Sequence, residues 1–112
     1  MISDYPFFVI LIINKNKITM ETLNELRKIK NEVLEMKFSY KNIQRVMYLL
    51  YKTKNLFESD SPIPNKDIAL HQANKVIEQE MLELITSEGD KKIEDAFNEV
   101  IDNFNLVLGY IG

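Results

Sequence analysis

The chain has 112 residues, of which 46% are hydrophobic and 28% charged, and it carries a formal net charge of -3 at pH 7. This length can bury one modest core, and the composition is that of an ordinary globular domain. The acidic balance argues against a nucleic-acid scaffold, which usually presents a basic surface to the phosphate backbone. Free nucleotides remain possible ligands because they arrive with their own cation. No cysteine is present, so disulfides and thiolate metal sites are excluded.

The first apolar segment runs from Tyr5 to Ile13. Its stretch Phe7–Ile13 is rich in β-branched and aromatic residues, which predicts a short strand or an apolar arm. A segment of this length is too short to cross a bilayer core of about 30 Å as a helix, and it lacks the basic region and cleavage site of an export signal. We therefore expect a cytoplasmic protein without a membrane partner, with an N-terminal arm over residues 1–18 before an all-α domain over residues 19–112.

Two helices are expected in the first part of that domain. Thr19 is a suitable N-cap for a helix that reaches about Lys37, and Ser39 is suitable for a second helix that reaches about Asn55. Both segments carry apolar residues at the spacing of one helical face, with charged residues on the opposite face. Each helix therefore has one side to bury.

Two further helices are expected after a loop over residues 58–65, where two prolines oppose helix formation. The third helix begins at the end of this loop and reaches about Thr86. Gly89 suits a left-handed position after it, and Asp90 suits the cap of a fourth helix that reaches about Tyr110. Four helices joined by short connections predict an antiparallel four-helix bundle.

Two pairs of carboxylates, Glu80/Glu83 and Glu99/Asp102, lie on the last two expected helices. Residues three apart share one side of a helix, so each pair can aim its oxygens at one point. On a regular helical wheel Glu80 falls inside the apolar arc, where a charge needs a cation or a strong donor. If the helices pack antiparallel, both pairs can face one cleft with oxygen donors that suit Mg²⁺ or Mn²⁺. The same spacing is typical of solvated acidic surfaces, and it does not by itself decide between the two interpretations.

The stretch from about Val46 to Ile111 resembles the MazG-like and phosphoribosyl-ATP-pyrophosphohydrolase-like branch of the all-α nucleoside triphosphate pyrophosphatases. The signature of that family is a helix with E-E-x-x-E, a spacer, and a helix with E-x-x-D. The corresponding segments are Gln79–Glu83 and Glu99–Asp102, with Gln79 in place of the first glutamate. The proline-containing loop before the first motif and the Glu88-Gly89-Asp90 turn after it are also similar.

The resemblance implies that Glu80, Glu83, Glu99 and Asp102 bind Mg²⁺, or Mn²⁺, and carry catalysis. The family hydrolyses the α–β phosphoanhydride of a nucleoside triphosphate or related nucleotide to a monophosphate and pyrophosphate. A hard metal neutralises the phosphates and lowers the pKa of the attacking water in this chemistry. The family's assemblies imply a homodimer or homotetramer. The alternative is a catalytically inactive helical module that binds a protein partner or a nucleotide without turnover.

Several polar residues near the acids are candidates for substrate contacts. Lys75 and Lys91 could contact phosphates, although exposed lysines are common on any helical surface. Asn103 and Asn105 interrupt the apolar pattern of the last helix, and contact with a nucleotide and contact with a partner subunit are both open for them. His71, the single histidine, is expected to have a hydrogen-bonded structural role.

Overall fold

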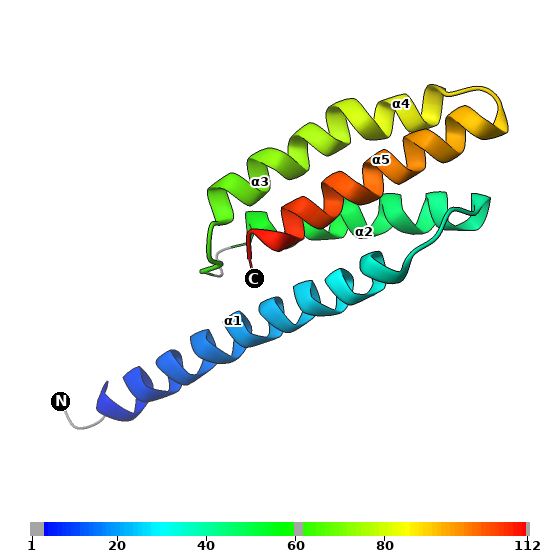
Figure 1. The fold of residues 1–112 in the computed structure, drawn as a ribbon. Helices are drawn as coiled ribbons and strands as arrows, with labels where there is room; N and C mark the ends of the chain where they lie inside the picture. The colour runs from blue at the N-terminus through cyan, green and yellow to red at the C-terminus, as the bar shows by residue number, and fades with distance from the viewer. Residues whose placement is uncertain (1–3, 60–61, 112) are drawn as a thin grey trace.

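The structure is a computed structural model that describes the backbone of residues 4–59 and 62–111, and the side chains of residues 20–59 and 62–111. Its elements are α1 (Asp4–Glu35), α2 (Tyr40–Glu58), α3 (Lys66–Lys75), the π-helical turn η1 (Val76–Glu80), α4 (Met81–Thr86) and α5 (Asp90–Gly109). All of these elements are helical, as the sequence predicts for residues 19–112, and α3, η1 and α4 follow one another as a continuous rod (Figure 1). Within the described residues, no helix combines the length and apolar character that a membrane crossing requires.

Helix α1 begins much earlier than the sequence predicts. The segment Phe7–Ile13 is helical instead of a strand, and Thr19 lies inside the helix instead of capping it. Short apolar runs are compatible with either structure, so their β-branched content was a weak indication of a strand. Figure 1 shows that the N-terminal half of α1 extends beyond the other helices, whereas its C-terminal half lies against α2 and α5.

The predicted start of α2 is confirmed. Ser39 is extended, with φ -161° and ψ 155°, and its hydroxyl accepts a hydrogen bond from the backbone N–H of Asn42 at 3.1 Å. This contact satisfies one of the N–H groups that a helix leaves unpaired at its start. The helix ends at Glu58, slightly later than predicted, and part of the proline-containing loop lies outside the described residues.

The turn into α5 differs from the prediction in its details. Gly89 has a positive φ of 90°, as expected, but its ψ of 140° lies outside the left-handed helical region, and Gly89 itself is the N-cap. Asp90 is the first residue of α5, and its carboxylate accepts a hydrogen bond from the hydroxyl of Tyr40 at the start of α2. The beginnings of α2 and α5 are therefore tied together.

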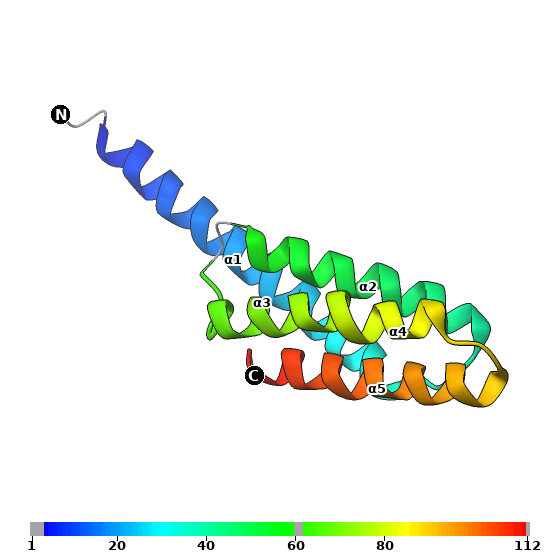
Figure 2. The same ribbon diagram turned by 90° about the horizontal axis from the view of Figure 1, so that it is seen from above.

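Helix α5 supplies a large part of the core. It contacts α1, α2, α3, η1 and α4, and Figure 2 shows it running alongside the α3–α4 rod. Its apolar face is buried against these neighbours: Ala96, Phe97, Val100, Ile101, Phe104, Val107 and Leu108. Burial of large aromatic side chains stabilises such a small domain strongly. The core therefore fixes the rotation of α5, and with it the direction of every polar residue on that helix.

Two ion pairs join α1 to α2. The guanidinium of Arg45 donates to both carboxylate oxygens of Glu32, at 2.6 and 2.8 Å, and the Lys52 ammonium lies 3.1 Å from a carboxylate oxygen of Glu25. Arg45 lies over one side of the Tyr48 ring, 5.3 Å from its centroid. The hydrogen bond and charge of Arg45 hold the pKa of the Glu32 carboxyl below its ordinary value, and those of Lys52 act in the same way on the pKa of Glu25.

Candidate functional site

Glu80 is the last residue of the π-helical turn, and this turn decides where its side chain lies. Glu80 lies four residues after Val76 and four residues before Leu84 in the sequence. A regular α-helix would therefore place its side chain in the middle of the buried seam. In the structure, the backbone N–H of Met81 instead donates to the carbonyl of Val76, five residues earlier, whereas an α-helix would use the carbonyl four residues earlier. Met81 thereby takes the core position, with a side chain 2% exposed, and Glu80 moves to a half-buried edge.

The Glu80 carboxylate faces α5. Its Oε1 accepts a hydrogen bond from the side-chain amide of Asn103 at 3.3 Å, and the same amide nitrogen donates to the backbone carbonyl of Glu99 at 3.0 Å. Glu80 Oε2 is buried and has no hydrogen-bond partner among the described residues. Buried polar atoms are normally paired, so an unpaired carboxylate oxygen indicates a partner from outside the chain.

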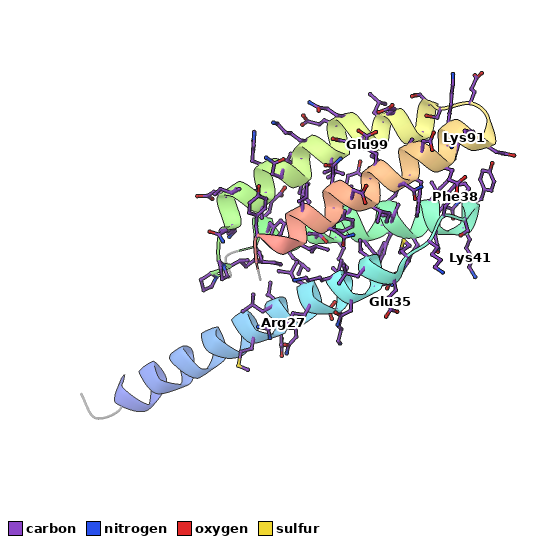
Figure 3. The ribbon with its side chains drawn as sticks, viewed as in Figure 1. Arg27, Glu35, Phe38, Lys41, Lys91 and Glu99 are labelled. Carbon is purple, nitrogen blue, oxygen red and sulfur yellow. The ribbon has the colours of Figure 1, made fainter. Side chains whose placement is uncertain are left out.

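The other three acids of the two motifs lie on the surface. Glu83 is exposed on α4, and Glu99 and Asp102 are exposed on α5. Figure 3 shows Glu99 on the stretch of α5 that runs beside η1 and α4. Across the residues whose side chains are described, no three acidic or imidazole groups gather closely enough to hold a metal ion. The structure thus brings Glu80 and Asn103 together and leaves the remaining acids exposed on the same pair of helices.

The donor set is chemically suited to a hard divalent cation. Carboxylate oxygens are the ligands that Mg²⁺ prefers, and this ion commonly binds through only one or two carboxylates, keeping several waters and phosphate oxygens as its other ligands. Glu80 Oε2 offers one such oxygen without competing hydrogen bonds. Glu83 follows three residues later on the same rod but is exposed, so the fit to the cation that the motif implies rests on the chemistry of the Glu80 oxygen.

The lysines predicted to contact phosphate lie at different distances from Glu80. Lys75 is in the last turn of α3, directly before the π-helical turn that ends at Glu80. Lys91 lies in the first turn of α5, twelve residues before Asn103 and therefore about 18 Å away along the helix axis. Its ammonium is 3.5 Å from Asp95, and Figure 3 shows Lys91 next to the turn between α4 and α5. Lys91 is therefore not near Glu80 within one chain.

Two other polar residues are also placed by the structure. Asn105 is two residues beyond Asn103, on a different side of α5, and its Oδ1 is buried without a hydrogen-bond partner among the described residues. His71 is exposed on α3. Neither residue contacts Glu80 through a hydrogen bond.

The α4 and α5 surface that carries the acids also carries exposed apolar residues. The exposed fractions of Leu82, Ile85 and Leu106 are 55%, 59% and 65%. Single exposed leucines are ordinary on a protein surface, but several on two adjacent helices are typical of a surface that another molecule covers.

Sequence reasoning predicted a site at the four acids but did not predict the π-helical turn or the contact between Glu80 and Asn103. The available signal was Glu80 itself, because a regular wheel puts this acid in the buried arc. An acid in a buried arc can be relieved by an inserted residue, and π turns of this kind occur often at functional sites.

Comparison of the chain with models of known protein families gives no match, and comparisons with curated proteins and with solved structures give none either.

Proposed function

We propose that this protein is a Mg²⁺-dependent nucleotide pyrophosphohydrolase that cleaves the α–β phosphoanhydride of a nucleoside triphosphate or related nucleotide, on an antiparallel four-helix bundle in the cytoplasm. The observation that supports this most directly is the buried, unpaired Oε2 of Glu80, within a motif that resembles the metal-binding signature of such enzymes. An unpaired buried polar atom costs about 1–3 kcal/mol. A bound cation would offset that cost.

The four acids of the two motifs would share the work of metal binding and proton transfer in this reaction. Glu80, Glu83, Glu99 and Asp102 would hold Mg²⁺, with Mn²⁺ as a substitute. When bound, the ion would neutralise the charge of the phosphates and lower the pKa of a water molecule. A carboxylate that the ion does not engage would accept the proton of the attacking water.

The two lysines would contact the phosphates of the substrate. Lys75 is the nearer of the two to Glu80, and its ammonium is exposed where a phosphate can reach it. Lys91 stays a predicted phosphate contact, but it is a weaker candidate than Lys75 because it lies farther from Glu80. Replacement of Lys75 by Gln would raise the KM for the nucleotide more than it lowers kcat, because a phosphate contact of this kind acts mainly on binding.

The same surface supports an assembly of two or four chains. Leu82, Ile85 and Leu106 are exposed on the two helices that carry Glu83, Glu99 and Asp102, so a second protomer that covers them would also shield part of that surface from water. We expect light scattering to give the mass of a dimer or tetramer, and Leu106→Lys to shift the protein toward monomer. A monomeric native protein would remove this part of the proposal.

The alternative function is a helical module without turnover. The exposed apolar residues of α4 and α5 favour it too, because a protein partner of another kind could cover them. Such a module would bind its partner or a nucleotide with or without Mg²⁺, and it would release no pyrophosphate.

Pyrophosphate release from a panel of nucleoside and deoxynucleoside triphosphates with Mg²⁺ separates the two functions. The native chain is expected to release pyrophosphate from at least one of them, and Glu80→Gln is expected to lose that activity. Glu78→Gln is the matched control, because Glu78 is an exposed acid of the same π-helical turn outside the two pairs. Folded native protein that is inactive on the whole panel would favour the binding module.

A further inference from the structure

The side-chain amide of Asn103 is held from two directions. Its nitrogen donates to the carbonyl of Glu99 on its own helix, at 3.0 Å, and to Oε1 of Glu80 across the helix interface, at 3.3 Å. The backbone beneath it is fixed, because Val100 and Phe104 on either side of it along α5 are completely buried. Asn103 therefore presents its donor to Glu80 from a rigid support.

The backbone of Glu80 is equally constrained. It ends the π-helical turn, and the residues next to it in the core, Val76 and Met81, are each 2% exposed. Movement of Glu80 along or around its helix would expose one of these side chains. The carboxylate can therefore respond to Asn103 only by rotation of its own side chain.

We propose that Asn103 is a positioning residue that engages Oε1 of Glu80 and so presents Oε2 alone to a divalent cation, as a monodentate ligand. This inference rests on the proposed metal site. Coordination through both oxygens would make Oε1 serve the amide and the ion at once, whereas Oε2 has no competing hydrogen bond. The partner atoms agree with this arrangement: Oε1 is paired, and Oε2 is buried and unpaired.

The amide is suited to this task in a way that a carboxylate or an apolar side chain is not. An asparagine donates to Glu80 without adding charge, whereas an aspartate of the same shape would bring a second negative charge within about 3 Å and raise the electrostatic cost. An alanine would leave Glu80 free to turn. Groups that orient a metal ligand typically change metal affinity by 10–100-fold when they are removed.

Mn²⁺ binding to the full chain, measured from the electron paramagnetic resonance signal of the free ion, tests this role. We expect Asn103→Ala to weaken Mn²⁺ binding by about tenfold or more, and Asn98→Ala to leave it unchanged. Asn98 is the matched control because it is an exposed asparagine of the same helix. Both substitutions favour the helix, so both variants are expected to fold.

The outcomes distinguish the inference from the proposed function. A native chain that binds no Mn²⁺ overturns both. Native binding that Asn103→Ala does not weaken overturns the positioning role and leaves the metal site standing. In a Glu80→Gln background, Asn103→Ala is expected to cause no further loss of Mn²⁺ binding. An equal loss in that background would show that Asn103 does not act through Glu80.

Discussion

The backbone N–H of Met81 donates to the carbonyl of Val76, five residues earlier, and both side chains are 2% exposed. Five residues of a regular α-helix turn by about 140° beyond a full rotation. Without the π-helical turn these two side chains could not share one buried seam. The turn therefore acts as a one-residue insertion that keeps the core continuous on both sides of it.

Deletion of Gln79 tests this interpretation of the turn. It would make Val76 and Met81 neighbours at i and i+4, so we expect the regular helix to form and the free energy of unfolding to stay within about 1 kcal/mol of the native value. Deletion of Asn98 from the regular helix α5 is the control. It would rotate half of that helix out of the core, and it should cost more than about 4 kcal/mol by urea denaturation. Equal losses for the two deletions would contradict the interpretation.

Glu80→Met should stabilise the protein when no divalent cation is present. The replacement removes a buried oxygen without a partner and leaves the Asn103 amide bonded to the carbonyl of Glu99. We expect a gain of about 1 kcal/mol in urea denaturation with EDTA. Glu83→Met, at an exposed acid, should change stability by less than about 0.5 kcal/mol. A loss of stability for Glu80→Met would mean that the carboxylate is already satisfied in the metal-free protein.

The two glycines at the ends of α5 should respond to alanine in opposite directions. Gly89 has a φ of 90°, a conformation strained for any residue with a Cβ, although nothing lies within 4 Å of one built there. We expect Gly89→Ala to cost at least about 1 kcal/mol. Gly109 is helical and also has open space, so Gly109→Ala should stabilise by up to about 1 kcal/mol. Thermal melts of both variants check the pair, and a neutral Gly89→Ala would count against the strain.

Local chemistry explains which helix boundaries the sequence predicted. Ser39 caps α2 and Gly89 has a positive φ because a hydroxyl cap and a glycine turn depend on only a few adjacent residues. The start of α1 was wrong because Thr19 is a good cap in isolation, and a cap pattern does not show whether the residues before it are already helical.

The candidate site was predictable only in part, for a related reason. Spacing predicted that Glu80 and Glu83 lie one turn apart, and that prediction needs nothing beyond one helix. The π-helical turn results from competition between Glu80 and Met81 for a place against α5, and the contact with Asn103 depends on the rotation that Phe104 gives that helix. Both features require the packed helices together.

Acid should remove the contribution of the ion pair between Glu32 and Arg45. The pKa of Glu32 is lowered from its ordinary value of 4.5, so the stabilisation is present above that value and is lost as the pH falls through the lower folded value. Because both side chains are well exposed to solvent, which screens their attraction, Arg45→Met should lower the stability only slightly at neutral pH. This small loss should disappear as the pH falls below 4.5 and the folded protein takes up a proton on Glu32. Arg27→Met is the control at an exposed α1 arginine, and a cost for Arg45→Met that does not depend on pH would contradict the assignment.

The two ion pairs between α1 and α2 also specify one alignment of these helices. Glu25 and Glu32 are seven residues apart, and so are their partners Lys52 and Arg45, in the opposite order along the chain. Both pairs can therefore form in only one antiparallel register, and a slip of α1 by a single turn separates both at once. Contacts that individually add little to stability thus discriminate between neighbouring registers. The same discrimination sets how far the N-terminal half of α1 reaches past the other helices.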